Sequence, residues 1–329
     1  CFSQRLTGNC GIFCSQNNGY GCLLSRWLPS FGYSYYYANV GDMRNMGVEM
    51  ELTGTPIKTN DLEWNLRLNL THYKNKITYL PEKRKTLDLG GHGGYSSGSY
   101  FYGEGLPLYT YRLQKYAGVN ENGEALYYVD VKDQNGKVTG RTTTTNYSSA
   151  TYYDCGTALP DVYGGFGTTL TYKGFDLTLD FQFTWGVDVM QEYYHSTVAR
   201  FLTNGIDRLY KEAWHPTLNP SGKEQAIRLN NFGQGANNQA DDDWVCNGSY
   251  LRCNMIQLGY TFNPTLIKKI GLSSLRLYAN VNNAFLITSK DYNGYDPDNS
   301  SRLGDNKWGL TANSSPIRVR ERFTFGLNV

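Results

Sequence analysis

Long runs of alternating apolar and polar residues most constrain the fold of this 329-residue chain. Between positions 62 and 71, leucine and tryptophan occupy every second position, with polar residues between them. The same alternation returns between positions 175 and 185. A period of two residues is typical of a β-strand with one apolar and one polar face. Each run is about ten or eleven residues long, which is longer than most globular strands and suits a tilted strand that crosses a bilayer.

Further runs extend this pattern along the chain. One ends at Tyr172, and only Lys173 and Gly174 separate it from the run that starts at Phe175, which predicts a tight hairpin. We count roughly ten candidate strands by this criterion. Apart from those already named, the clearest lie at positions 256–262, 275–285 and 317–329.

The composition excludes several classes of protein. With 31 Lys and Arg against 29 Asp and Glu, the net charge of +2 is too even for an electrostatic binder of nucleic acid. No stretch approaches the ~18 consecutive apolar residues of a membrane helix. The aromatic content of 15% argues against disorder. A β-rich chain remains, either soluble or a membrane barrel.

The connections between the predicted strands are uneven in length. Some span about two to ten residues, whereas positions 89–105, 186–248 and 291–315 form long polar tracts. Apolar residues at helical spacing between Met190 and Leu209 predict a helix inside the second tract. Short turns at one end and long loops at the other are typical of outer-membrane barrels. A soluble β-sandwich is the alternative.

Aromatic and charged residues fit the membrane interpretation. Three arginines alternate with apolar residues in the last run, which would be costly in a protein core and is acceptable facing a water-filled lumen. Aromatic residues near strand ends are expected to form girdles at the two membrane interfaces. These residues are Trp64, Tyr73, Tyr172, Trp185 and Tyr260.

Several blocks resemble one family of transporters. Positions 39–49 read N-x-G-x-M-x-N-x-G-x-E, through Asn39, Gly41, Met43, Asn45, Gly47 and Glu49. Four blocks follow in order at positions 159–186 (LPDVYGGFGTTLTYKGFDLTLDFQFTWG), 249–262 (SYLRCNMIQLGYTF), 278–285 (YANVNNAF) and 294–298 (GYDPD). Together with LLSRWLPS at positions 23–30, they resemble the SusC/RagA family of TonB-dependent outer-membrane transporters.

The resemblance implies an all-β fold, an antiparallel transmembrane β-barrel with long extracellular loops. Residues 1–329 would be the C-terminal half, an arc of about ten of about 22 strands around a plugged lumen, and the plug domain and TonB box would lie outside it. An arc with two open edges cannot span a membrane alone, so it must join the rest of the barrel.

The resemblance also implies a function in the outer membrane of a Gram-negative bacterium. That function is active import of an oligosaccharide or peptide, with a SusD-like surface lipoprotein as the lid and the TonB complex acting through the plug. Contact with outer-membrane lipid is expected and contact with nucleic acid is not. The alternatives are a passive porin and a soluble carbohydrate-binding or glycosidase-like β-sandwich.

Ligand-binding residues are expected among loop aromatics and lumen-facing arginines. No catalytic residue, cofactor or metal site is expected, since transport requires only conformational gating. The candidate ligand-binding residues are Trp244, Tyr292, Tyr295, Arg318, Arg320 and Arg322.

Other motifs are attributed to chance or to solvated loops. The G-x-S-x-G match at Gly94, Ser96 and Gly98 lacks the strand and helix that a nucleophile elbow requires. The acidic loop at 130–136 lacks the ligand spacing of an EF-hand, although a looser calcium site is not excluded. Carboxylates at 241–243, 296 and 298 show no established glycosidase pair. The four histidines show no ligand spacing.

The seven cysteines do not have the spacing of a zinc site. An oxidising envelope would permit a disulfide, for example between Cys10 and either Cys14 or Cys22. Cys155, Cys246 and Cys253 are interpreted as unpaired or unassigned.

Overall fold

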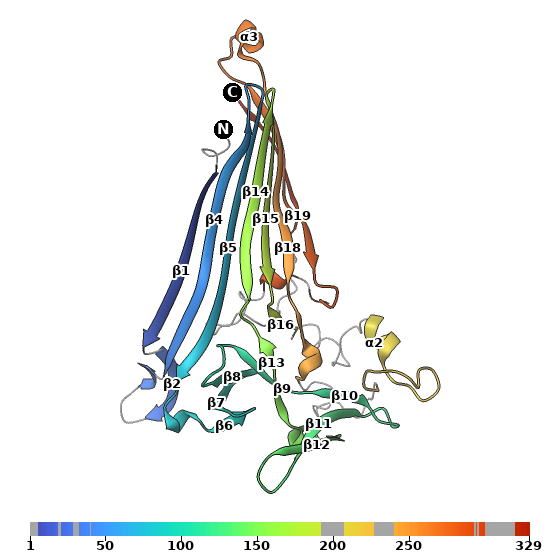
Figure 1. Cartoon of the computed structure of the whole chain (residues 1–329). Coiled ribbons are helices and arrows are strands. Elements are labelled where there is room, and N and C mark those ends of the chain that lie inside the picture. Colours follow the sequence, from blue (N-terminus) through green and yellow to red (C-terminus); the bar gives the residue numbers. More distant parts are fainter. Residues whose placement is uncertain are drawn as a thin grey trace.

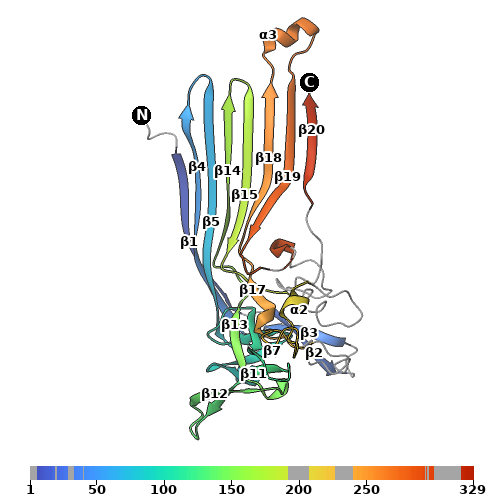
Figure 2. The same cartoon turned by 90° about the vertical axis from the view of Figure 1, so that its right-hand side faces the viewer.

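The computed structural model describes residues 6–18, 21–28, 33–39, 41–191, 207–226, 240–292, 294, 296–299 and 320–329. Its main feature is one antiparallel sheet of long strands that curves into an arc (Figures 1 and 2). In sheet order the strands are β1 (Leu6–Asn18), β4 (Asp42–Lys58), β5 (Leu62–Tyr79), β14 (Val162–Tyr172), β15 (Phe175–Trp185), β18 (Tyr250–Thr261), β19 (Arg276–Thr288) and β20 (Arg322–Asn328).

The predicted fold class is confirmed. Within the described residues the arc has eight strands, fewer than the roughly ten predicted by alternation. The strands β2 (Gly21–Leu28) and β3 (Tyr33–Asn39) pair with each other in a separate hairpin and not with the arc. None of the helices in the described part of the chain has the length and apolar character needed to cross a bilayer.

The register between neighbouring strands aligns the apolar residues on one face of the sheet and the polar residues on the other. Leu68, Phe166 and Phe181 stand opposite one another on three neighbouring strands, so they share one face. We call this side the apolar face. It stays open to the surroundings, since Phe166 is 39% exposed and Leu258 is 54% exposed. A soluble β-sandwich would bury this face under a second sheet, so that alternative is wrong.

The two ends of the arc differ as the sequence predicted. At the turn end, three residues join β4 to β5 and two join β14 to β15. Lys173 and Gly174 both adopt positive φ, 48° and 90°, which gives the two-residue hairpin turn that suits the twist of the strands. At the loop end, the connections 80–161, 186–249 and 289–321 carry most of the remaining chain (Figure 2).

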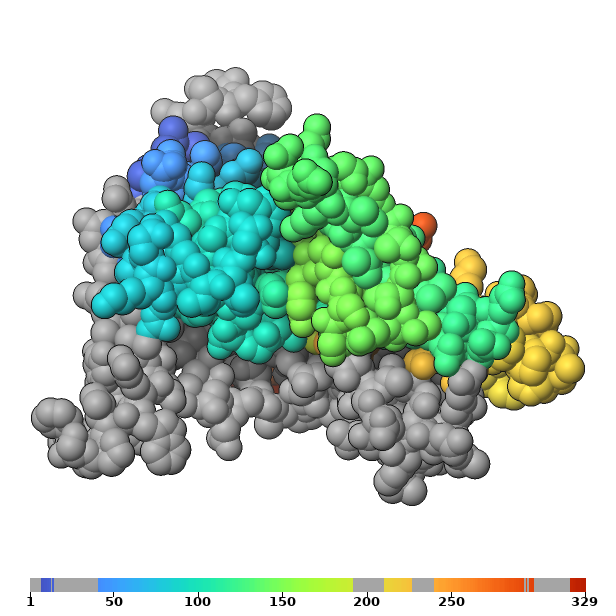
Figure 3. Space-filling view, turned by 90° about the horizontal axis from the view of Figure 1, so that it is seen from below, coloured from blue at the N-terminus to red at the C-terminus, as the bar shows by residue number. Residues whose placement is uncertain are grey.

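The loop end carries a layer of small sheets. Seen from this end, the segments of β6–β9 and of β11–β13 lie side by side (Figure 3). A five-stranded sheet has the order β13 (Tyr152–Thr157), β9 (Thr110–Gln114), β8 (Tyr100–Gly103), β7 (His92–Ser97), β6 (Leu87–Leu89). A three-stranded sheet contains β10 (Tyr116–Val119), β11 (Ala125–Lys132) and β12 (Val138–Thr144). A third pairs β16 (Asp188–Met190) with β17 (Val245–Asn247).

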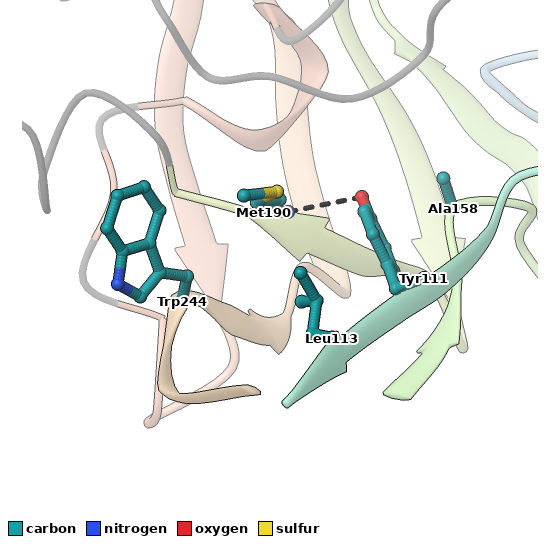
Figure 4. Close-up of a cluster of buried hydrophobic side chains, with 5 residues drawn as sticks. All are labelled: Tyr111, Leu113, Ala158, Met190 and Trp244. Carbon is teal, nitrogen blue, oxygen red and sulfur yellow. Dashed lines mark hydrogen bonds between the residues drawn. The ribbon is translucent and has the colours of Figure 1, made fainter. Parts of the chain in front are cut away.

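A buried cluster fastens these sheets together. Tyr111, Leu113, Ala158, Met190 and Trp244 pack against one another although they come from four separate segments (Figure 4). The Tyr111 hydroxyl accepts a hydrogen bond from the Met190 amide at 3.2 Å. Long loops therefore form an ordered layer with its own core.

The predicted helix between Met190 and Leu209 is wrong at its first residue, because Met190 lies in β16 and pairs with β17. Helix α2 (Asp207–Glu212) overlaps its end. The central predicted residues, 192–206, lie outside the described part of the chain.

Candidate functional site

The second face of the arc is polar and carries the candidate site. Residues that stand opposite each other on neighbouring strands share this face, as Arg67, Gly167 and Asp180 do. The Arg67 guanidinium forms an ion pair with Asp180 at 3.1 Å, and Arg276 pairs with Asp176 at 2.7 Å. In a closed barrel this face lines the lumen, where water and solute meet it.

Glycines on the polar face let long side chains lie across the sheet. A Cβ added to Gly167 would stand 2.6 Å from Nε of Arg67. A Cβ on Gly326 would stand 2.2 Å from the Tyr278 ring. The absence of side chains at these positions therefore fixes where Arg67 and Tyr278 lie on the wall.

A pocket of about 450 Å³ opens on this face near the loop end; we call it the wall pocket. Gln182 lies in it, donating a hydrogen bond from Nε2 to the Tyr250 hydroxyl at 3.1 Å. Asn69 also lines it, and its Oδ1 accepts a hydrogen bond from the Gly165 amide at 2.7 Å. The pocket is lined by Arg67, Asn69, Pro160, Tyr163, Gly164, Gly165, Phe166, Asp180, Phe181, Gln182, Phe183, Thr184, Tyr250, Asn254 and Asp298.

The wall pocket brings together sequence blocks that are far apart in the chain. Apart from Arg67 and Asn69, every lining residue belongs to the block at 159–186, the block at 249–262 or the block at 294–298. The sequence comparison found these blocks as separate motifs. The sheet and the final long loop place them around one cavity.

A buried ion pair connects two of these blocks beside the pocket. The Arg252 Nη2 atom donates to Oδ1 of Asp296 at 2.5 Å and lies 3.7 Å from Asp298. The side chains of Arg252 and Asp296 are only 6% and 3% exposed. Oδ1 of Asp296 also accepts a hydrogen bond from the Asp298 amide at 3.0 Å. The pair thus fastens the loop after β19 to β18, and Asp298 reaches the pocket.

Comparisons with known proteins find similar sequences and a similar solved structure. No family model matches the chain. TonB-dependent receptor P3 of Formosa agariphila is 29% identical over 93% of this chain and 31% of its own length. TonB-dependent receptor SusC of Bacteroides thetaiotaomicron is 28% identical over 88% of this chain and 27% of its own length. The structure of the RagAB peptide transporter superposes with a TM-score of 0.76 at 22% identity, over 99% of this chain and 33% of that one.

In sequence the chain is similar to TonB-dependent receptors, SusC among them, and in fold it is similar to the RagAB peptide transporter. It spans a little under a third of the length of the curated relatives it matches. The structural likeness confirms the barrel fold. The relatives are named as receptors, and the solved assembly is named as a peptide transporter.

The motif at positions 39–49 enters β4 at Asp42, and from there its residues Met43, Asn45, Gly47 and Glu49 lie on the polar face. Asn45 accepts a hydrogen bond through its Oδ1 from Nδ2 of Asn75 at 2.6 Å. The Oδ1 of Asn75 in turn accepts from the Leu108 amide, at 2.7 Å, in the loop layer. Met43 is 5% exposed beside this network. Through Asn75, Asn45 of this motif thus connects the loop layer to the barrel wall.

The residues predicted to bind ligand lie in different surroundings. Trp244 is 8% exposed and packs in the buried cluster of the loop layer. Tyr292 is also 8% exposed, and its amide donates to the Ser289 carbonyl. Arg320 and Arg322 are exposed at the start of β20, with Arg322 opposite Asn282 on the polar face. Tyr295 and Arg318 lie outside the described residues. Ligand contact by these six residues stays a prediction.

Sequence reasoning missed the wall pocket and the Arg252–Asp296 pair. A usable signal was present for the pair, because Arg252 sits in a strand-forming block and Asp296 in the GYDPD block. A positive and a negative residue in two such blocks are candidates for an ion pair. Only the fold shows that Arg252 and Asp296 are the two that meet.

The aspartates at positions 241–243 hold the loop layer in place. Asp242 Oδ1 accepts a hydrogen bond from the Tyr116 amide at 2.7 Å, and Asp241 accepts one from the Asp243 amide at 3.2 Å. Burial raises the pKa of Asp241 well above its usual value, and the neighbouring Asp243 and Asp242 raise it further. Burial is also the main cause that raises the pKa of Asp242. These carboxylates bond to the backbone of their own layer.

The remaining motifs have structural roles in the described residues. Gly98, with φ of 61°, forms the turn between β7 and β8, so Ser96 has no following helix and the nucleophile elbow is absent there. Asp133 Oδ1 accepts from the amides of Asn135 and Lys137 in a hairpin turn. No group of three potential metal ligands occurs among the residues that the structure places.

Two cysteines of β1 lie on the apolar face. Cys10 stands opposite Met50 and Cys14 opposite Met46. Four residues along one strand separate the two cysteines by about 13 Å, which a disulfide cannot span. The suggested Cys10–Cys14 bridge is therefore wrong, and both thiols are free.

One predicted girdle residue also lies elsewhere. Tyr73 contacts Tyr163 edge to face at 6.1 Å on the polar side of the sheet. The rings of Phe175 and Tyr260 instead meet on the apolar face at the turn end, 4.4 Å apart. Aromatic residues therefore line both faces. Because side chains alternate along a strand, the position of each residue in its strand decides which face it lies on.

Proposed function

We propose that this chain forms the C-terminal part of a barrel that imports a nutrient through the outer membrane, driven by TonB. The wall pocket carries the proposal, because residues of three family blocks converge there on the face turned to the lumen. The relatives named as TonB-dependent receptors support the energy source. The apolar face supports contact with outer-membrane lipid.

In this proposal the polar face is the wall of the solute path. Solute enters from the loop end, and TonB releases it inward by pulling on a plug contributed by another part of the protein. A SusD-like surface lipoprotein closes over the loop layer. The chain needs no covalent chemistry for this work, because differential binding in open and closed states suffices.

A short peptide suits the wall pocket better than an oligosaccharide. Arg67 and Asp180 offer both signs of charge within one cavity, which complements the charged termini of a peptide. Gln182, Asn69 and Asn254 supply amide donors and acceptors for its backbone. A neutral glycan would leave the charges unused, although Tyr163 gives it a ring to stack on.

Uptake by cells that carry the full-length receptor tests the proposal. Gln182→Trp fills the pocket, and we expect at least about a tenfold loss in peptide uptake, the equivalent of about 1.4 kcal/mol of binding. Leu179→Trp is the matched control, because Leu179 lies on the apolar face of the same strand and does not line the pocket. Both variants are compared at equal abundance in the outer membrane.

Three outcomes contradict the proposal. Equal uptake by the Gln182→Trp and Leu179→Trp variants would exclude the pocket from the solute path. Uptake that persists without TonB would favour a passive pore. Recovery of the solute in chemically altered form from purified receptor would point to an enzyme.

A further inference from the structure

One connection at the turn end is longer than its neighbours require. The other described turns there use two or three residues, whereas residues 262–275 join β18 to β19. This connection contains α3 (Pro264–Ile267) and the 3-10 turn η6 (Lys268–Ile270). Figure 1 shows it standing beyond the ends of the strands.

The connection is an ordered structure. Asn263 caps the helix through its Oδ1, which accepts from the Thr265 amide at 2.9 Å, and Pro264 occupies the first turn. Gly271 ends it at a φ of 79°. Ile267 is 3% exposed, so its side chain is buried within the structure of this connection and its surroundings.

Two large apolar side chains of this helical segment are left open. Leu266 and Ile270 are 61% and 68% exposed. Leu266 lies in α3 and Ile270 ends η6, so both exposed side chains belong to this one short helical segment, whereas Ile267 between them is buried. Burial of apolar side chains is favourable, and a well-capped segment that displays two of them needs an apolar partner.

The segment begins at the level of the aromatic girdle. The ring of Tyr260 lies 4.4 Å from Phe175 and 4.9 Å from Phe262. Such aromatic clusters on the apolar face mark the boundary between hydrocarbon and headgroups. Asn263 follows Tyr260 by three positions, so α3 starts in the headgroup layer.

The charges at this end complement anionic lipid. Lys268 and Lys269 are exposed, and Lys173 lies at the neighbouring turn. The acidic groups Glu63 and Asp176 are paired with Lys58 and Arg276. Asp61 is the remaining acid of the described turns, and its carbonyl accepts a hydrogen bond from the Lys173 amide. The balance is therefore basic.

We propose that residues 263–272 form a membrane foot that lies in the headgroup layer of the adjacent leaflet. Leu266 and Ile270 enter the acyl boundary, continuing the apolar face of the barrel, while Lys268 and Lys269 bind the phosphate groups of anionic phospholipids. The inference rests on the membrane placement in the proposed function.

Nitroxide labels test the depth of the foot. The full-length receptor, with its native cysteines replaced, is placed in nanodiscs of phosphatidylethanolamine and phosphatidylglycerol. Labels at Leu266→Cys and Ile270→Cys are expected to be more accessible to oxygen than to a water-soluble nickel chelate. Leu258→Cys, on the apolar face of β18, is the membrane control, and Leu218→Cys, 82% exposed in the loop layer, is the water control.

The controls separate two kinds of failure. If the label at 258 is reached by the nickel chelate, the membrane placement itself is wrong. If the label at 258 lies in lipid while 266 and 270 behave like 218, the foot projects into water and the inference is overturned. Shielding of 266 and 270 from both reagents would indicate a protein partner and would also overturn it.

Lysine acetylation gives a second test without replacing any cysteine. The native receptor is acetylated in nanodiscs with and without phosphatidylglycerol, and each lysine is quantified by peptide mass spectrometry. Headgroup binding is expected to slow acetylation of Lys268 and Lys269 about fivefold each in the anionic discs. Lys137, exposed at the turn of the β11–β12 hairpin, should react equally in both. If Lys268 and Lys269 were acetylated at the same rate with and without phosphatidylglycerol, lipid binding would be contradicted.

Discussion

Removing the carboxylate of Asp296 should release the loop after β19 from the barrel wall. Asp296→Asn keeps the size of the side chain and leaves the Arg252 guanidinium buried without its charged partner. Breaking a buried ion pair by removing one partner costs about 3–5 kcal/mol. The side chains are 6% and 3% exposed, so solvent does little to compensate for the loss.

Two details place the expected cost at the lower end of that range. Asp298 lies 3.7 Å from the same Arg252 nitrogen and supplies some remaining attraction. The Nε atom of Arg252 is buried without a hydrogen-bond partner, so the pair is held through one nitrogen. We therefore expect about 3 kcal/mol, which corresponds to roughly a hundredfold larger population of the opened loop.

Hydrogen–deuterium exchange in nanodiscs measures this opening directly. Amides of residues 289–292 and 296–299 should exchange about two orders of magnitude faster in Asp296→Asn than in the native receptor. The double variant Arg252→Met with Asp296→Leu should recover most of the protection, because an apolar pair replaces a buried ionic one at little cost. Lys58→Ala, which breaks an exposed pair with Glu63, should leave this loop unchanged.

Native exchange rates in Asp296→Asn would refute the reasoning. That result would mean that the loop is held by other contacts and that Arg252 is compensated elsewhere. Faster exchange in the double variant than in Asp296→Asn would also contradict it, since the cost would then come from lost contacts and not from an unpaired charge.

Three other predictions concern the loop layer and the wall. The pKa of buried Asp241 is raised above its unfolded value near 3.8, so folding favours the protonated carboxyl group. Its contribution to stability is fully present below pH 3.8 and is lost as the pH rises through the folded pKa. The loop layer should therefore be more stable at pH 5 than at pH 7.5. Asp241→Asn should raise the unfolding temperature at pH 7.5 and flatten this pH dependence in thermal scans; an unchanged slope would assign it to other groups. Asn75→Ala removes the acceptor of the Leu108 amide and should cost about 1 kcal/mol locally, seen as faster exchange at residues 106–109, with Asn122→Ala as a surface control. Gly167→Leu should displace the Arg67 side chain and lower peptide uptake, whereas Leu170→Met on the apolar face of the same strand should not; equal uptake would exclude the Arg67–Asp180 pair from the path.

The sequence by itself determined the strands, their faces and the difference between the two ends. Alternation at positions 62–71 and 175–185 identified β5 and β15, and Lys173 with Gly174 identified the hairpin turn. These features are local, because side-chain direction in a strand and the geometry of a two-residue turn depend on near neighbours alone. The same alternation predicts Arg322 on the polar face, and the structure places it there, opposite Asn282.

Only the tertiary structure decided which polar and aromatic residues are buried and which line the lumen. Trp244 in a polar loop gives no sign that it packs beside Tyr111 and Met190, and Arg252 gives no sign that it meets Asp296, 44 residues away. The physical reason is that burial in the loop layer and the convergence at the wall pocket depend on strand register and on loops that pack across the sheet. Both are set by contacts between segments far apart in sequence, which no local pattern records.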